Sequence, residues 1–354
     1  MRTHRVTAPG ILRAVFDLHS VRNRVFLRLQ HLPPHVLRRL SGGTTTVLGR
    51  TLDVQAQMLC FLVARVSPHA ATLTPAVARQ TLDRDAPTAT GPIRPMRRVD
   101  DFDLGRGVRA RWYLPKTAAD ARGPLIVYFH GGGFVTGSVE SHDRFVRILA
   151  DETGLRALSV EYRLAPEHPF PAAVDDALHA YSWALENADR LGADRARIAV
   201  AGDSAGGNLA AVVSRDARDR GLRLPALQVL LYPPTDLTRA LESHRTFARG
   251  FMLDKRSLDY YHGLYAADAR DERASPLLAR SFHGLPPALV VTAGFDPLVD
   301  EGDAYALALA KAGTKVTHRR YDSLIHGFTL MSAAIDAAME ANLDLARDVR
   351  AALA

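Results

Sequence analysis

The sequence contains a single cysteine, Cys60, and only two tryptophans in 354 residues. One cysteine cannot form a disulfide within the chain, which excludes the small disulfide-stabilised secreted domains and favours a reducing compartment. Long apolar runs are also missing, since no stretch approaches the roughly 18 consecutive apolar residues that span a bilayer. Arg13, Asp17 and His19 interrupt the apolar residues near the N-terminus, unlike the unbroken apolar core of a secretory signal. The expected location is therefore cytoplasmic.

Lysine is absent from residues 1–50, where nine arginines face one acid, Asp17, a balance of +8. The whole chain carries +7, so the remainder is close to neutral. Such a basic segment is typical of a solvated helical face, of a membrane-surface contact or of nucleic-acid binding. No nucleic-acid motif or interleaved aromatic platform accompanies the charge, so nucleic acid is not an expected partner. We favour the solvated face and leave a weak membrane-surface association open.

The order of helical and apolar segments predicts an α/β fold. Residues 1–83 have mostly helical patterns, and residues 83–100, rich in Pro, Thr and Arg, are predicted to be a linker. Short apolar runs without polar alternation then predict strands buried on both faces of a parallel sheet. They are Leu125–Phe129, Ala157–Tyr162, Ile198–Gly202, Leu227–Tyr232 and Ala288–Thr292. Helical patterns lie between them, so we expect a mostly parallel central sheet flanked by helices.

Gly202-Asp203-Ser204-Ala205-Gly206 is the strongest local signal, a G-x-S-x-G match between a predicted strand and a predicted helix. A sharp strand-to-helix turn exposes the serine hydroxyl, and glycines two residues on either side avoid clashes at that turn. The turn also places the hydroxyl near free amides at the helix N-terminus, which favour negative charge. The motif therefore predicts Ser204 as a nucleophile.

His130-Gly131-Gly132-Gly133 directly follows the predicted strand LIVYF. Consecutive glycines let backbone amides approach a ligand together, and near Ser204 the amides of Gly132, Gly133 and Ala205 would form an oxyanion hole. A phosphate loop would need a Lys-Ser/Thr ending or a G-x-G-x-x-G opening, and the sequence has neither here.

A nucleophilic serine of this kind needs a histidine and an acid, which follow it in the order Ser, Asp/Glu, His. Asp296 lies just past the predicted strand ALVVT, and His326 lies in a glycine-flanked loop after it. His318 also follows Asp296 but falls in a predicted strand. Asp300 and Glu301, the competing acids, lie within a helix, where acids in the first turn suit the helix dipole. We therefore predict Asp296 and His326 as the partners of Ser204.

Several sequence blocks together resemble the hormone-sensitive-lipase-like esterases of the α/β-hydrolase superfamily. The blocks occur in the family's order and extend over roughly the last 230 residues of the chain. They are HGGGF at 130–134, YRLAPEHPFPAA at 162–173, GDSAGGNLA at 202–210, SPLLA at 275–279, DPLVDEG at 296–302 and HGF at 326–328. The resemblance implies Ser204 as nucleophile, Asp296 as acid, His326 as base and Gly132, Gly133 and Ala205 as oxyanion donors. It assigns the YRLAPEHPFPAA block a structural role, and it implies no metal and no organic cofactor.

The resemblance also implies a helical cap over the site. We expect residues 1–95 to form an N-terminal cap segment with its linker, and residues 96–354 the catalytic domain, with a cap insertion at about 236–272. The N-terminal segment is longer and richer in arginine than the usual cap of this family. Association of two copies through a sheet edge is common in the family, so a homodimer is also an expectation.

The expected function is hydrolysis of short- to medium-chain acyl esters through an acyl-enzyme. Three alternatives stay open at this point: a lipase for longer-chain or membrane lipids, an amidase or deacetylase, and a non-enzymatic ligand receptor on the same fold. The three predicted triad residues do not separate the hydrolases from one another, because pocket shape sets the leaving group.

Overall fold

The computed structural model describes residues 25–354, and its centre is an eight-stranded sheet. The strands run in the order β10-β9-β8-β7-β5-β6-β4-β3. From β10 to β6 neighbouring strands are parallel, whereas β4 pairs antiparallel with both β6 and β3. The strands are β3 (Arg98–Gly105), β4 (Val108–Leu114), β5 (Gly123–Phe129), β6 (Arg156–Glu161), β7 (Ala193–Asp203), β8 (Gln228–Leu231), β9 (Ala288–Phe295) and β10 (Val316–Ile325). The predicted α/β-hydrolase sheet is confirmed, and all five predicted strands belong to it.

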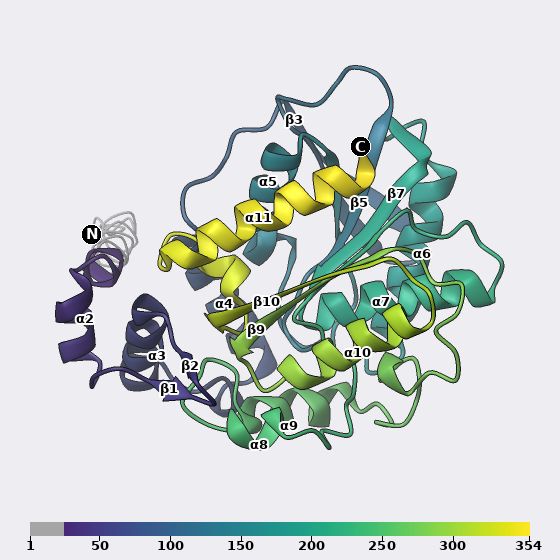
Figure 1. Cartoon of the computed structure of the whole chain (residues 1–354). Coiled ribbons are helices and arrows are strands. Elements are labelled where there is room, and N and C mark those ends of the chain that lie inside the picture. Colours follow the sequence, from purple (N-terminus) through teal and green to yellow (C-terminus); the bar gives the residue numbers. More distant parts are fainter. Residues whose placement is uncertain (1–24) are drawn as a thin grey trace, which may run out of the picture.

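Helices cover both faces of the sheet (Figure 1). The helices of the catalytic body are α5 (Val139–Thr153), α6 (Ala172–Glu186), α7 (Ala205–Asp219), α10 (Val299–Lys311) and α11 (Asp336–Leu353). Helix α11 contacts α5 on one face, and α6 contacts α7 on the other. Short 3₁₀ turns are η1 (Ala70–Thr72), η2 (Pro276–Leu278) and η3 (Phe328–Met331).

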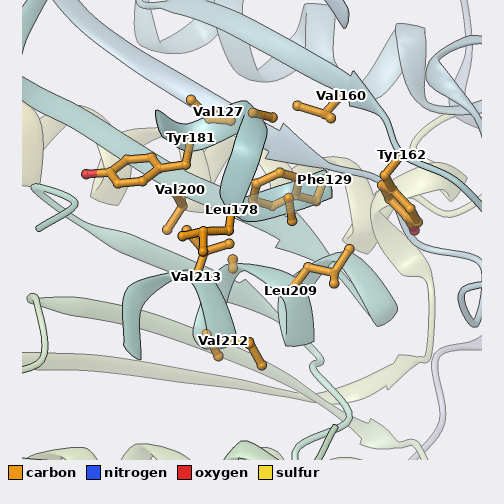
Figure 2. Packing of buried hydrophobic residues seen from close by; sticks show 14 of the residues in the cluster. Val127, Phe129, Val160, Tyr162, Leu178, Tyr181, Val200, Leu209, Val212 and Val213 are labelled. Atoms are coloured by element: carbon orange, nitrogen blue, oxygen red, sulfur yellow. The ribbon is translucent and has the colours of Figure 1, made fainter. Parts of the chain in front are cut away.

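The central strand β5 shows why the strand sequences lack alternation. Every one of its residues is buried. Val127 and Phe129 belong to the core layer under α6 and α7, which Figure 2 shows, while Ile126 and Tyr128 belong to the layer on the opposite face. Side chains alternate between the faces of a strand, and both faces here are covered by helices. An apolar residue is therefore favoured at every position.

The N-terminal part and the 236–272 region supply elements outside the sheet. They are α2 (Pro34–Leu40), a hairpin of β1 (Thr46–Val47) and β2 (Arg50–Thr51), α3 (Val54–Val66), α4 (Pro75–Thr90), α8 (Ser243–Thr246) and α9 (Lys255–Tyr265). Residues 25–30 are also helical, and the predicted helical pattern before residue 25 lies outside the described residues. Within residues 25–354, no helix has both the length and the apolar character needed to cross a bilayer.

The predicted linker at 83–100 is largely wrong. Helix α4 begins after the Thr74 cap and continues through Pro87 to Thr90, where Gly91, with a φ of 111°, ends it. Strand β3 then begins at Arg98. A composition rich in Pro, Thr and Arg favours a loop, but packing of α4 against α5 outweighs that local preference. The connection is therefore confined to the few residues between Gly91 and Arg98.

Substitution of Gly206 tests how closely the start of α7 approaches the end of strand β5. A Cβ on this residue would overlap the backbone carbonyl of Phe129, which belongs to the central strand and cannot move aside. We expect Gly206→Ala to lower the free energy of unfolding by about 3 kcal/mol, at the upper end of the usual overpacking effect. Gly263→Ala is the matched control: this exposed helical glycine has open space around it, so alanine should stabilise by about 0.5–1 kcal/mol. Urea denaturation of both variants measures the difference, and equal stabilities would contradict the crossing geometry.

Candidate active site

Ser204 lies at the turn between β7 and α7 in a backbone conformation that residues other than glycine rarely adopt. Its φ is 51° and its ψ is −121°. Two hydrogen bonds fix the turn: the Ser204 amide donates to the carbonyl of Leu231 at 2.8 Å, and the Ser204 carbonyl accepts from Asn208 N–H at 3.0 Å. Side chains at positions 202 and 206 would collide with backbone atoms, so the two motif glycines are required by space. The turn directs the Ser204 hydroxyl toward His326.

Ser204, His326 and Asp296 form one continuous chain of hydrogen bonds. The Ser204 hydroxyl lies 2.9 Å from His326 Nε2, and His326 Nδ1 lies 2.7 Å from Asp296 Oδ2. Asp296 is fully buried, and its other oxygen accepts from Leu298 N–H at 2.9 Å. With Nδ1–H donated to the carboxylate, Nε2 is left free to accept the serine proton. The structure thus brings together the three residues that the sequence order selected from widely separated segments.

The ring of Tyr232 packs edge-on against His326, with ring centroids 4.8 Å apart. Its hydroxyl is hydrogen-bonded to that of Thr329 in η3, close to the His326 loop. Tyr232 therefore limits rotation of the imidazole, a contact that the sequence motifs did not indicate.

The glycine loop after β5 lies directly beside the Ser204 turn. Gly132 and Gly133 have φ values of 117° and 62°, which favour glycine. The Gly132 carbonyl closes the loop by accepting from Val135 N–H at 3.1 Å and Thr136 N–H at 2.9 Å. No acceptor in the described residues takes the amides of Gly132, Gly133 or Ala205. These three donors are free for an oxygen atom of a bound molecule.

Asp203, next to the serine, connects the Ser204 turn to the glycine loop. Its Oδ1 accepts from Gly131 N–H at 2.8 Å and from the Tyr128 hydroxyl at 2.6 Å. Burial acts to raise the pKa of this carboxyl, but His142, 3.3 Å away, and the Tyr128 hydroxyl outweigh burial, so the net pKa is lowered. Asp203 is therefore held as an anion beneath the site. Sequence reasoning missed it, although its place beside Ser204 in the motif was a usable signal.

His130 and Tyr162 stack on each other next to the glycine loop, and His130 is hydrogen-bonded to it. Their rings are stacked with centroids 4.2 Å apart, and the Tyr162 hydroxyl donates to the His130 carbonyl at 2.7 Å. His130 Nδ1 lies 2.8 Å from the Gly131 carbonyl, so Nδ1 carries the proton of a neutral ring. Tyr162 begins the YRLAPEHPFPAA block. Its contacts agree with the structural role that the resemblance implied for this block.

The competing residues of the sequence analysis take other partners. His318 lies in strand β10, and its Nε2 lies 2.9 Å from Asp303 Oδ1. Glu301 lies in the first turn of α10, as predicted. It is buried, and its Oε2 lies 2.8 Å from Nε2 of His244 in α8. Burial raises the pKa of Glu301 to about 7. This acid thus anchors the 236–272 region.

Helix α9 places an aromatic side chain over the glycine loop. A Cβ on Gly133 would overlap the Tyr261 ring, and Tyr265 stacks on Phe134 with centroids 3.9 Å apart. The same helix contacts the N-terminal part, since Asp254 lies 3.0 Å from His69 and the Tyr260 hydroxyl donates to the Leu73 carbonyl at 3.2 Å. Two segments distant in the sequence therefore meet beside the site.

The sheet topology, the strand–serine–helix turn and the Ser–His–Asp chain of hydrogen bonds define an α/β-hydrolase-fold protein, and the profile of that fold family matches residues 126–330. The chain belongs to the hormone-sensitive-lipase-like esterases of this superfamily.

Relatives of known activity support the same class. The carboxylic ester hydrolase LipN of Mycobacterium tuberculosis is 42% identical over 85% of this chain and 83% of its own. The ethyl acetate hydrolase of Pseudomonas putida is 39% identical over 68% of this chain and 79% of its own. Among solved structures, the ester hydrolase EH1AB1 from the metagenome of Lake Arreo superposes with a TM-score of 0.82 at 41% identity, over 85% of this chain and 98% of its own. The chain is thus a carboxylic-ester hydrolase, and the ligand-receptor alternative is set aside.

The buried His130 gives a testable pH dependence. Burial, followed by the nearby His142, lowers the pKa of His130 to about 3, whereas an unfolded histidine has a pKa of about 6.5. The unfolded chain therefore binds a proton first as the pH falls, and stability is lost from pH 6.5 downward by up to about 1.4 kcal/mol per pH unit. We expect His130→Gln to flatten this dependence between pH 6.5 and 4 in urea denaturation series.

The control for this experiment is His168→Gln, which changes an exposed histidine and should leave the slope unaltered. If the wild type and His130→Gln lose stability in parallel over this pH range, His130 is not held neutral by burial.

Proposed function

We propose that Ser204 is the nucleophile of this esterase, with His326 as general base and Asp296 as the acid that orients it. His326 Nε2 takes the hydroxyl proton as Ser204 Oγ attacks the ester carbonyl carbon. The buried Asp296 carboxylate accepts Nδ1–H, which fixes the tautomer and stabilises the imidazolium that forms. The single observation that carries the assignment is the unbroken Ser204–His326–Asp296 chain of hydrogen bonds, at 2.9 and 2.7 Å.

The amides of Gly132, Gly133 and Ala205 are proposed to hold the oxyanion. The negative charge that forms on the carbonyl oxygen needs donors already in place, and removal of one such donor typically lowers kcat about 10²–10³-fold. Collapse of the tetrahedral intermediate breaks the bond to the alcohol oxygen, which takes the proton from His326. Water, deprotonated by His326, then attacks the acyl carbon and returns free Ser204 and a carboxylic acid.

Substrates with short to medium acyl chains are the class we propose. Residues up to about 95 and the 236–272 insertion act as a cap in this proposal, and Tyr261 above Gly133 supports it because the ring occupies space next to the glycine loop. A relative named ethyl acetate hydrolase points in the same direction. Lipase and amidase or deacetylase activities are the alternatives.

Hydrolysis of p-nitrophenyl esters from acetate to palmitate tests the assignment and the substrate class together. We expect the highest kcat/KM at acetate to hexanoate, and we expect Ser204→Ala to remain folded with kcat reduced at least about 10⁴-fold, because the nucleophile is lost. A fluorophosphonate probe should label the wild type and not the variant. Near wild-type turnover by Ser204→Ala would refute the nucleophile assignment.

Matched amide substrates extend the same experiment to the leaving group. Faster amide than ester hydrolysis would favour an amidase, and a maximum at palmitate would favour a lipase.

A weak contact with an anionic membrane surface is a second part of the proposal. Arg28, Arg38 and Arg39 are exposed, and helix α2, which carries the last two of them, contains no acidic residue. Exposed apolar side chains accompany them, with Val25 at 50% and Leu40 at 46% exposure. Cationic and apolar groups together are what an anionic bilayer interface attracts.

Vesicle co-sedimentation with phosphatidylserine-containing and neutral vesicles tests this contact. Each arginine near such a surface contributes about 1 kcal/mol, so the triple change Arg28→Gln, Arg38→Gln and Arg39→Gln should weaken binding about 100-fold. The control removes the same charge elsewhere, at the exposed residues Arg106, Arg195 and Arg270. Equal weakening of vesicle binding by both triple variants, or no binding by the wild type, would refute a specific membrane contact through Arg28, Arg38 and Arg39 and would favour a solvated helical face.

Assembly of two copies through a sheet edge stays a prediction of the family resemblance. Strand β10 forms one edge of the sheet, and residues 317–320 in it are exposed. Its charged side chains Arg319 and Arg320 are of the kind that limits indiscriminate edge pairing.

A further inference from the structure

Arg79 of α4 contacts the loop that follows the three glycines. Its Nε donates to the Val135 carbonyl at 2.8 Å, and its Nη2 donates to the Ala165 carbonyl at 2.8 Å. The same guanidinium forms a two-pronged pair with Glu167, at 3.0 Å through Nη1 and 2.6 Å through Nη2. The side chain of Arg79 is 25% exposed, whereas that of Glu167 is 54% exposed. The carbonyl contacts therefore lie on the inner side of the arginine and the ion pair on the outer side.

The two carbonyls belong to segments that are joined to the glycine loop. Val135 N–H donates to the Gly132 carbonyl at 3.1 Å, so Val135 is part of the turn that Gly132 begins. Ala165 N–H donates to the carbonyl of Phe134 at 2.9 Å. Arg79 thus bonds one residue of the turn and the residue that holds the turn from the opposite side. A planar guanidinium can satisfy both acceptors at once because its N–H groups point in fixed directions.

A second side chain of α4 reinforces the contact. Asp83 Oδ1 accepts from the Ser138 hydroxyl at 2.5 Å, at the N-terminal cap of α5. Positions 79 and 83 are one turn apart and lie on the same face of the helix. Helix α4 is therefore hydrogen-bonded at two points, Val135 and Ser138, to the segment that follows the glycines.

The backbone of a glycine loop keeps one conformation only if contacts from neighbouring segments restrict it. Gly132 and Gly133 both have positive φ, and glycine is the residue whose backbone is free to leave that conformation. Oxyanion donors contribute only when they are held close to their reacting position. The contacts that limit this freedom must come from neighbouring segments.

We propose that Arg79 is a positioning residue for the oxyanion hole: by bonding the carbonyls of Val135 and Ala165 it holds the Gly132 and Gly133 amides at the site of the developing charge. It touches neither substrate nor the reacting atoms. This inference rests on the oxyanion role proposed above. It assigns the N-terminal segment a part in the chemical step in addition to its part in covering the site.

Kinetics with p-nitrophenyl acetate test the proposal. We expect Arg79→Ala to lower kcat about 10- to 100-fold with KM within about twofold, because displacing a donor by a fraction of an ångström loses part of the 10²–10³-fold contribution of that donor. Arg79→Lys keeps the charge and can reach one carbonyl but not both, so its kcat should fall between those of Arg79→Ala and the wild type. Methylguanidinium added at millimolar concentration should restore kcat of Arg79→Ala about threefold or more.

Two matched controls separate positioning from general damage. Glu167→Gln removes the outer ion pair and leaves the carbonyl contacts, so kcat should stay within about twofold. Arg84→Ala removes an exposed arginine of the same helix, paired with the adjacent Asp85, and should also leave kcat unchanged. Thermal unfolding of each variant reports whether the fold is retained.

Unchanged kcat in Arg79→Ala, a change in KM alone, or an equal loss in Glu167→Gln would overturn the proposal. These outcomes differ from failure of the proposed catalytic role, in which Ser204→Ala would retain the activity of the wild type. If Arg79→Ala does not fold, Arg79→Lys decides: a kcat equal to that of the wild type would contradict positioning by the two-carbonyl contact.

Discussion

The buried Asp203 carboxylate is the interaction on which the arrangement of the site depends. Asp203 is the residue before Ser204, and its carboxylate accepts a hydrogen bond from the Gly131 amide. One side chain therefore joins the serine turn to the glycine loop. A buried anion is unfavourable unless it is paired and hydrogen-bonded. Here the Tyr128 hydroxyl and His142 provide those partners, and they fix the distance between two loops that follow different strands.

Tight backbone crossings complement this carboxylate. The strand order places β5 beside β7, so the loops after these strands emerge next to each other at the same edge of the sheet. Helix α7 approaches the end of β5 closely enough that position 206 has no room for a side chain. The serine turn is strained by itself, with a positive φ at Ser204, and strain of this kind persists only where the surroundings fix the conformation.

The sequence was sufficient to select the three residues that the structure joins by hydrogen bonds and that we propose as catalytic, because each lies in a local motif at a strand end. Ser204 has its flanking glycines, and Asp296 and His326 follow in the order that the fold demands. The supporting contacts of Asp203 with Gly131, and of Arg79 with Val135, join positions 56 or more residues apart, and no local pattern encodes such pairs. The prediction of a linker at 83–100 was wrong for the same reason, because packing against α5, and not the composition of the segment, stabilises α4.

The two segments beside the site also constrain each other. Helix α4 contacts the glycine-loop region through Arg79, and helix α9 does so through Tyr261. The segment that leads into α4 is joined to the start of α9 by His69 and Asp254. A change that widens the space above the glycines by moving either helix therefore also displaces a contact of the loop. Substitution of a single side chain that lines the space avoids this coupling. On the proposed cap role, we therefore expect substrate range to be easier to alter through side-chain size on α9 than through movement of whole segments.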